Sequence, residues 1–471
     1  MINELLKHFP YETPRSSQLE AIKQIANKWD DTEVFVISAA VGTGKTALAV
    51  TLQSYLIAQK SSCAYLVPNN ALRKQAMEEF PFLRTVKKKT EYWLDKYNMT
   101  QDEFCRKHYA FGPKGAQYFK DLAHVKTKKV RLVANYFTYM AHKLYKKNVV
   151  IDEAHKMLET LRGLHYDKLW RHDYNYPDGL DTVGALAAWL EGQPDTKVVQ
   201  KLKKELASAA PSTIINYTES MFRGYPSECI ELLPLSVKGH KEIFWRGDTE
   251  KIFLMSATIS QKDVEYLGLA DKKVTYIDLD SDIPKENRPI MPLNVGSMTY
   301  KNQDESIPKV AAKILELCEK HSNEKGFIHA PYSVAYKLRA HLTGDRFIFH
   351  TENNKKEALE RFLESDNAVM IGSGLTEGLS LDHDKARFQC IAKLQYPSLQ
   401  DPAMRWIARN ESEYYQWLTG RDVMQASGRN CRTPDDYGIT YILDSAWEMW
   451  YNKCSDLLPK WFTEAVISET S

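Results

Sequence analysis

The segment Ala39 to Thr46 has the residue types and spacing of a phosphate-binding loop. It reads Ala-Ala-Val-Gly-Thr-Gly-Lys-Thr (a Walker A pattern), follows an apolar run over Val34 to Ser38 and leads into an apolar helix-forming stretch. Glycines let backbone N–H groups curl around a phosphate, and the amino end of a helix adds positive potential. Lys45 would neutralise the β/γ oxygens of a nucleoside triphosphate, and the Thr46 hydroxyl would hold Mg²⁺. A chance glycine-rich turn is the alternative, and the preceding strand and the Gly-Lys-Thr sequence argue against it. The residues expected to bind the phosphates are Gly42, Thr43, Gly44, Lys45 and Thr46.

A second segment supplies two adjacent carboxylates at the end of an apolar run. Val149 to Ile151 leads into Asp152-Glu153-Ala154-His155, a DEAH sequence. Ligands of open parallel sheets bind at the carboxyl ends of strands, where this pair would lie. We expect Asp152 to hold Mg²⁺ through water, Glu153 to orient or deprotonate the attacking water, and His155 to sense the γ-phosphate. A lone Asp-Glu pair is usually a solvated loop, but the phosphate loop upstream favours ATP hydrolysis.

Short apolar, β-branched runs alternate with helix-period segments and predict the elements that position these groups. Near-continuous apolar runs suit strands buried on both faces of a parallel sheet, so we expect an α/β fold. The series pauses over residues 156–247, where helical spacing and prolines predict a mostly helical insertion. A proline-rich crossing at Asp282 to Pro289 separates the two series. We expect one domain over 1–155 and 248–285 and a second over 286–471. The runs are 34–38, 64–67, 130–133, 148–151 and 252–255, then 326–329, 347–349, 368–371, 389–392 and 438–443.

Composition limits the class of protein. The 471 residues are 43% hydrophobic and 26% charged, which excludes wholesale disorder, and the formal net charge of +2 means that any nucleic-acid surface must come from local patches. The 7 cysteines form no CxxC pair, so we expect no zinc site and a reducing compartment. No stretch approaches the ~20 apolar residues of a membrane helix, so we expect a cytoplasmic protein with no membrane partner.

The motifs, taken in order, resemble those of superfamily 2 helicases. Met255-Ser256-Ala257-Thr258 follows DEAH at another strand end, and the segment from Gln425 to Arg432 fits the pattern QxxGRxxR. The resemblance implies two RecA-like P-loop domains, with Gln425 at the ATP site and with Arg429 and Arg432 reaching the γ-phosphate when the domains close. Read alone, the two arginines would more often lie on an exposed helix face.

Finer features resemble the XPD/DinG-like branch. Phe9 to Glu12 and Arg15-Ser16-Ser17-Gln18 look like its adenine-side motif, which implies that Arg15 and Gln18 bind ATP. Val67-Pro68-Asn69-Asn70 resembles motif Ia, a loop that contacts the nucleic-acid backbone, and Val133-Ala134-Asn135-Tyr136 before DEAH is also typical. In motif V, Glu377-Gly378-Leu379-Ser380 implies Gly378 at the ATP site but has serine in place of the usual aspartate. Many members carry a four-cysteine iron–sulfur cluster between the phosphate loop and DEAH. Only Cys63 and Cys105 lie there, so we expect no iron–sulfur cluster.

Basic residues interleaved with aromatic residues between Phe80 and Arg131 are typical of a single-strand path. The alternative is a solvated helix face with the rings in the core. At the position of helicase motif IV, Tyr332 and Ser333 either contact the sugar–phosphate backbone or begin a helix, with Ser333 as its N-cap. The expected nucleic-acid contacts are Asn69, Asn70, Lys87, Lys88, Lys89, Lys128, Lys129, Tyr332 and Ser333.

These features together predict an ATP-dependent DNA helicase or translocase. The family resemblance implies single-stranded DNA or a forked duplex as partner and 5′→3′ movement. ATP and Mg²⁺ are the expected ligands, and we expect a monomer. Two alternatives stay open: an ATP-switched nucleic-acid clamp without unwinding, and an RNA helicase, because the motifs do not read the 2′-hydroxyl.

Overall fold

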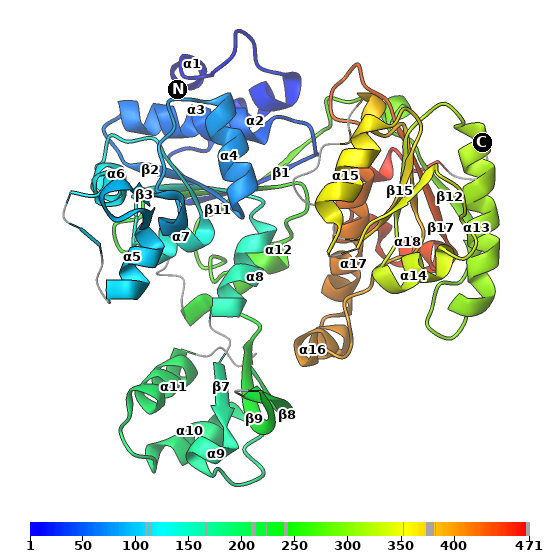
Figure 1. Ribbon diagram of the computed structural model, residues 1–471. Helices are drawn as coiled ribbons and strands as arrows, with labels where there is room; N and C mark the ends of the chain where they lie inside the picture. Colours follow the sequence, from blue (N-terminus) through cyan, green and yellow to red (C-terminus); the bar gives the residue numbers. More distant parts are fainter. Residues whose placement is uncertain are drawn as a thin grey trace. The chain divides into compact units, whose positions relative to one another are not determined.

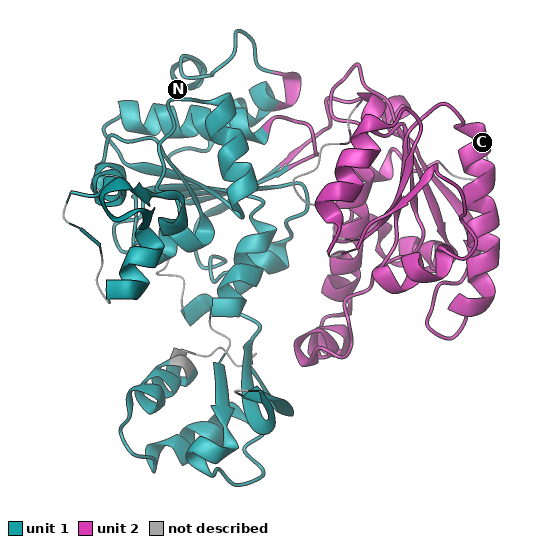
Figure 2. Cartoon of the chain, viewed as in Figure 1, with its two compact units in different colours: residues 1–14, 18–38, 45–277 teal, residues 15–17, 39–44, 278–471 magenta. Residues whose placement is uncertain are grey.

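The computed structural model divides the chain into two compact units (Figure 2). Unit 1 comprises residues 1–14, 18–38 and 45–277, and unit 2 comprises residues 15–17, 39–44 and 278–471. Each unit is built on a six-stranded sheet, which confirms the predicted α/β class with two P-loop-type domains. The residues that the structure describes are 1–108, 112–113, 115–164, 167–208, 213–222, 224–239, 244–351, 353–373, 381 and 383–467.

The first sheet has the strand order β11-β1-β10-β6-β2-β5, in which β1, β10, β6, β2 and β5 pair in parallel. Strands β1, β2 and β11 of this sheet are labelled in Figure 1. Strands β2, β5 and β6 are buried at every position, as their unbroken apolar runs predict. In the parallel pairing of β10 with β6, Met255 lies beside Asp152. The strand ends that carry the Ser-Ala-Thr and DEAH motifs are therefore neighbours. The strands are β1 (Val34–Ala39), β2 (Cys63–Val67), β5 (Leu132–Asn135), β6 (Asn148–Asp152), β10 (Lys251–Ser256) and β11 (Val274–Leu279).

Helices connect these strands and position the motifs at their amino ends. Helix α3 begins at Lys45, directly after the glycine-rich loop, and α4 begins at Asn70, after β2. The helices are α1 (Ile2–Leu6), α2 (Ser16–Asn27), α3 (Lys45–Ala58), α4 (Asn70–Glu79), α7 (Tyr136–Ala141), α8 (His155–Leu164) and α12 (Gln261–Tyr266).

Residues between α4 and β5 form a small subdomain. Its elements are β3 (Trp93–Leu94), β4 (Met99–Thr100), α5 (Gln101–His108) and α6 (Gln117–Lys126). Tyr92, Phe104 and Tyr118 are 7%, 8% and 3% exposed and belong to its core. The Tyr92 hydroxyl donates to Asp121 at 2.9 Å and accepts the N–H of Lys87 at 3.1 Å. These three rings therefore hold the subdomain together.

The insertion after α8 corrects one expectation. Sequence spacing predicts mostly helices over residues 156–247, and α10 (Val183–Glu191) and α11 (Lys197–Ser208) form within this range. The structure adds a three-stranded antiparallel sheet of order β7-β9-β8, against which the helices bury Leu186, Leu190 and Leu202. Half-exposed strands carry no continuous apolar run, which is why the hairpin escaped prediction. The remaining elements are β7 (Asp167–Trp170), α9 (Arg171–Tyr174), β8 (Thr213–Phe222) and β9 (Tyr225–Pro234).

The second sheet has the order β12-β17-β16-β13-β15-β14 with parallel pairing throughout. Adjacent residues of β13 belong to different cores: Ile328 packs with α13 and α14, and Phe327 packs with α15 on the other face. This alternation shows a sheet covered on both faces. Strands are β12 (Ile290–Gly296), β13 (Gly326–His329), β14 (Phe347–Phe349), β15 (Val369–Gly372), β16 (Phe388–Ile391) and β17 (Ile439–Asp444).

Helices of unit 2 complete the fold. They are α13 (Gln303–Lys320), α14 (Tyr332–Leu338), α15 (Lys355–Glu364), α16 (Pro402–Asn410), α17 (Ser412–Ser427), α18 (Ala446–Cys454) and α19 (Lys460–Thr463). Across the described part of the chain, none of the helices combines the length and the apolarity needed to span a membrane.

Candidate nucleotide-hydrolysis site

The glycine-rich loop leaves β1 and closes at the first turn of α3. Gly42 and Gly44 have φ of +88° and +71°, values that L side chains rarely adopt, so glycine is required at both positions. Thr43 is 3% exposed, and its hydroxyl donates to the Ala40 carbonyl at 2.9 Å. The loop is thus shaped by its own hydrogen bond, with Lys45 and Thr46 beginning the helix behind it.

Asp152, at the carboxyl end of β6, is 7% exposed and is held at both carboxylate oxygens. The Tyr65 hydroxyl donates to Oδ2 at 2.9 Å, and the Glu153 N–H donates to Oδ1 at 2.9 Å. Burial, reinforced by the negative charge of Glu153, raises the pKa of Asp152 to about 6, and the Lys45 ammonium opposes this rise. Lys45 therefore lies close enough to Asp152 for their charges to interact.

This donor set fits Mg²⁺ rather than a softer metal. The Tyr65 hydroxyl interacts with both Asp152 and Thr46, which brings the two expected metal ligands to one place. Among the described residues no group of three or more His, Cys, Asp and Glu side chains could hold a metal ion. One carboxylate and one hydroxyl leave most coordination positions to water and phosphate oxygens, which is how Mg²⁺ is usually bound.

The DEAH turn is tied to the strand beside it. Glu153 has a left-handed φ of +47°, and the next N–H, of Ala154, donates to the Met255 carbonyl at 3.0 Å. His155 is 2% exposed and its Nδ1 lies 2.8 Å from Ser256 Oγ, which also accepts the Thr258 N–H at 3.0 Å. Hydrogen bonds therefore join the Ser-Ala-Thr segment directly to the turn that carries the two carboxylates.

The two adenine-side candidates differ in their surroundings. The Arg15 guanidinium donates to the carbonyl of Gly42, so it braces the phosphate loop from the same unit. Beside it, the Ser16 hydroxyl and the Ser17 N–H donate to Asp282 at 2.7 and 2.9 Å. Gln18 is 6% exposed in α2.

The arginine motif begins in α17 and continues past its carboxyl end. Within unit 2, a Cβ built on Gly42 would lie 2.5 Å from the Arg432 carbonyl oxygen, and one on Gly428 would lie 2.8 Å from Val41. The phosphate loop and the segment 428–432 are therefore in contact. Arg429 Nε donates to the Gln425 carbonyl at 3.2 Å, and both side chains are partly exposed.

Gln389, which sequence reasoning did not single out, anchors this motif. Its side chain is fully buried in β16 and donates to the Ser427 carbonyl at 3.1 Å, Asn430 Oδ1 at 3.1 Å and Thr440 Oγ1 at 2.8 Å. Its Oε1 lies 3.0 Å from His329 Nε2. The only sequence signal is a polar residue inside an apolar strand run.

Gly378, the residue of motif V that is expected at the ATP site, lies outside the described residues.

The expected nucleic-acid contacts fall into separate places. Asn69 caps α4 by accepting the Leu72 N–H at 3.0 Å, and Asn70 Oδ1 accepts from Asn135 Nδ2 at 2.7 Å, both at the carboxyl edge of the first sheet. Tyr332 is 37% exposed at the start of α14, whose N-cap is Pro331 rather than Ser333. In the subdomain, Lys87 and Lys88 are exposed, and Lys89 Nζ lies 5.5 Å from the Tyr118 ring centre. Trp93 is 55% exposed.

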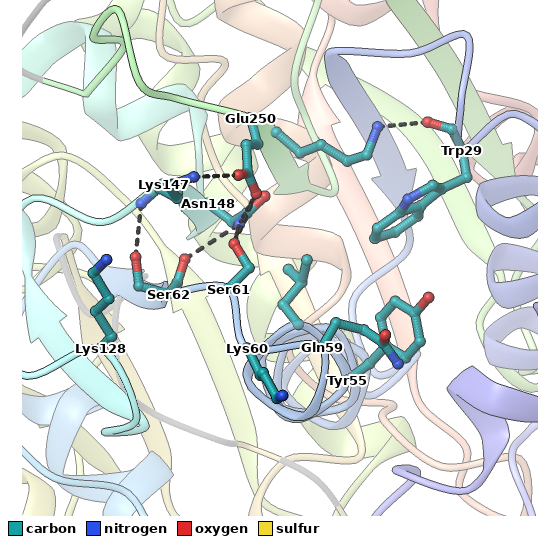
Figure 3. A pocket seen from close by; sticks show the side chains of 12 residues that line it. Trp29, Tyr55, Gln59, Lys60, Ser61, Ser62, Lys128, Lys147, Asn148 and Glu250 are labelled. Carbon is teal, nitrogen blue, oxygen red and sulfur yellow. Dashed lines mark hydrogen bonds and ion pairs between the residues drawn. The ribbon is translucent and has the colours of Figure 1, made fainter.

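Lys128 and Lys129 precede β5 and lie at the opposite, amino edge of the sheet. Lys128 lines a cavity of about 440 Å³ (Figure 3) together with Lys147, Glu250 and Lys251. Lys147 pairs with Glu250 at 2.7 Å, and Lys251 Nζ donates to the Thr32 carbonyl at 2.7 Å. This cavity is remote from the phosphate loop along the strands, so it is not the hydrolysis site.

Comparisons with known proteins agree with this architecture. The family model for the helicase C-terminal domain matches residues 314–465, and that for the type III restriction enzyme res subunit matches residues 12–176. A solved structure of S. tokodaii Xpd4 is 16% identical, with 96% of this chain and 99% of that chain covered and a TM-score of 0.60. An XPD helicase structure is 14% identical, with 95% and 99% covered and a TM-score of 0.63. A search of curated protein sequences finds no match.

Proposed function

We propose that this chain, whose fold matches that of XPD helicase structures and whose residues 314–465 match the helicase C-terminal domain model, hydrolyses ATP at the Lys45–Asp152 site to move along single-stranded DNA. One observation carries the proposal. A buried carboxylate, Asp152, lies within the field of Lys45 and is followed directly by a second carboxylate, Glu153, that is 31% exposed. Burying one acid beside a lysine while leaving its neighbour accessible suits two different roles, metal binding and water activation.

Each residue of the site then has a role in ATP binding or hydrolysis. Gly42 to Gly44 offer backbone N–H groups to the phosphates, and Lys45 neutralises the charge between the β- and γ-phosphates. Thr46 and Asp152 would hold Mg²⁺, which when bound would neutralise charge that develops on the phosphate oxygens. Glu153 orients a water for in-line attack and accepts its proton. Arg429 and Arg432 stabilise charge on the γ-phosphoryl group when the two domains close.

Nucleic acid would be bound by Asn69 and Asn70 in the first domain and by Tyr332 and Ser333 in the second. Different affinity for the strand in open and closed states would convert hydrolysis into movement. The exposed Lys87, Lys88 and Trp93 would extend this surface over the subdomain, with cations for phosphates and a ring for a base. The same family resemblance suggests 5′→3′ polarity.

Three measurements on the purified protein test the proposal. ATPase activity is measured alone and with matched single-stranded DNA and RNA, and strand displacement is measured on duplexes with a 5′ or a 3′ tail. We expect DNA-stimulated ATPase and unwinding from the 5′ tail. Stimulation without unwinding would indicate the clamp, and preferential stimulation by RNA would indicate an RNA helicase.

Two variants test the site itself. Lys45→Ala is expected to abolish ATP hydrolysis. Glu153→Gln is expected to retain ATP binding and lose turnover, because a neutral amide keeps the shape of the side chain without the charge that accepts the water proton. Substantial residual turnover by Glu153→Gln would refute the assignment of Glu153.

A further inference from the structure

We propose that Asn135 and Tyr136 form a positioning link that transmits strand binding at Asn70 to the catalytic turn at Glu153. The inference rests on the proposed ATPase and adds a source for its stimulation by nucleic acid. The residues concerned all belong to unit 1. They connect the carboxyl ends of three neighbouring strands, since β2 pairs with both β5 and β6.

The catalytic end of the link is the hydroxyl of Tyr136. Tyr136 is 1% exposed, and its Oη donates to the carbonyl of Asp152 and lies 3.1 Å from the carbonyl of Glu153. These carbonyls flank the residue whose φ is +47°, a conformation that non-glycine residues disfavour. A single buried hydroxyl that binds both peptide groups therefore holds Glu153 in a backbone conformation that the residue does not prefer by itself.

The other end of the link is Asn135, the last residue of β5 and the N-cap of α7. Asn135 Oδ1 accepts the Thr138 N–H at 2.7 Å, and Asn135 Nδ2 donates to Asn70 Oδ1 at 2.7 Å. Asn135 is 7% exposed, whereas Asn70 is partly exposed at the first turn of α4. With its Oδ1 engaged, Asn70 retains the amide donor that a strand phosphate accepts.

The chain of contacts has a direct mechanical consequence. A phosphate held by Asn70 would restrain the Asn135 amide, which sets the start of α7 and hence the place of the adjacent Tyr136 ring. Tyr136 in turn fixes the carbonyls around Glu153, whose carboxylate must meet the attacking water. Misplacement of a catalytic group by about 1 Å can cost ~100-fold in rate, so a small adjustment here is sufficient for stimulation.

The test measures kcat and KM for ATP with and without saturating oligothymidylate. Tyr136→Phe removes only the hydroxyl and is expected to lower kcat at least about tenfold while KM for ATP stays within about twofold. Tyr139→Phe is the matched control, because Tyr139 lies in the same helix, is also 1% exposed, and has a hydroxyl that accepts the Lys146 N–H at 3.2 Å away from the turn. It is expected to keep wild-type kcat.

Asn135→Ser tests the end of the link that faces the nucleic acid. Serine preserves an N-cap acceptor for α7 but is too short to reach Asn70. We expect the ratio of stimulated to basal kcat to fall about threefold or more. If thermal unfolding shows that Tyr136→Phe is less folded than Tyr139→Phe, the Asn135→Ser ratio decides the matter alone.

The outcomes separate this inference from the function on which it rests. Equal kcat for Tyr136→Phe and Tyr139→Phe, or an undiminished ratio for Asn135→Ser, would overturn the link while the wild type still hydrolyses ATP. A wild-type protein that hydrolyses no ATP would refute the proposed function and the link with it. An unchanged kcat with a raised KM for ATP would assign Tyr136 to nucleotide binding and also overturn the link.

Discussion

Lys146 carries a cation into the interior of unit 1, and its removal should change how stability depends on pH. The side chain is 6% exposed, and Nζ donates to the carbonyls of Val125 and Thr127 at 2.8 and 2.7 Å. No carboxylate is among these partners, so burial is not offset by an opposite charge. Burial accordingly lowers the pKa of Lys146 from 10.5 to about 8.

The sign and size of the effect follow from this pKa. Between about pH 8 and pH 10.5 the unfolded chain binds the proton and the folded chain does not, so stability rises with pH in that window. Below about pH 8 the cation is present in both states and its burial is a constant cost. Integrated from about pH 7 to about pH 9.5, the free energy of unfolding should rise by about 2 kcal/mol because of Lys146 alone.

Urea unfolding of wild type and Lys146→Met at several pH values isolates this contribution. Methionine keeps an unbranched apolar stem and does not titrate, so the difference between the two proteins should change by about 2 kcal/mol in favour of wild type as pH rises. Lys147→Met is the control. The Lys147 side chain is 41% exposed and its hydrogen bond with Glu250 raises its pKa, so its contribution is flat over this range and falls only at higher pH. A gap between wild type and Lys146→Met that does not vary with pH would refute the reasoning.

Three further perturbations address the sites. Replacing Lys87, Lys88 and Lys89 together by alanine should weaken binding of single-stranded DNA and flatten its salt dependence, measured by fluorescence anisotropy at several salt concentrations; unchanged binding would remove the subdomain from the strand path. Trp93→Ala should weaken the same binding by about 1–3 kcal/mol, a loss with little salt dependence because it is stacking that is removed. Gly42→Ala should abolish binding of a fluorescent ATP analogue, because a side chain is strained at φ +88° and its Cβ would meet the Arg432 carbonyl; normal affinity would contradict the proposed loop geometry.

Sequence pattern predicted the strands that carry continuous apolar runs and missed those that do not. The runs that became β1, β2, β6 and β10 are continuous and apolar, and each formed within a residue or two of its expected place. Strand β11 alternates buried and exposed positions toward its end, and β12 contains Pro292, so neither presents an apolar run. The β8–β9 hairpin is hidden for the same reason: its residues are mostly half-exposed.

The hydrolysis site was predictable as far as its residues are adjacent in sequence. Lys45 and Thr46 follow the glycines, and Asp152 and Glu153 follow a strand, so local order defines both groups. The residues that hold these groups in place are tyrosines, an asparagine and a glutamine within apolar segments, where a pattern counts them as core. Only the strand order, which puts β2 beside β6 and β5 on the other side of β2, brings the Tyr65 and Tyr136 hydroxyls to Asp152.

In the subdomain, buried polar groups also shape the surface that we propose binds single-stranded DNA. Tyr92 receives the Lys87 N–H and binds Asp121, so it fixes the loop that carries the exposed lysines. At the far end of α6, Lys146 binds the carbonyls of Val125 and Thr127 from a position two residues before β6. The strand that ends in Asp152 is thus tied at its amino end to this subdomain. A change that weakens the Lys146 contacts should therefore loosen the proposed strand-binding surface first, and reduce DNA binding at moderate salt before it reduces affinity for ATP.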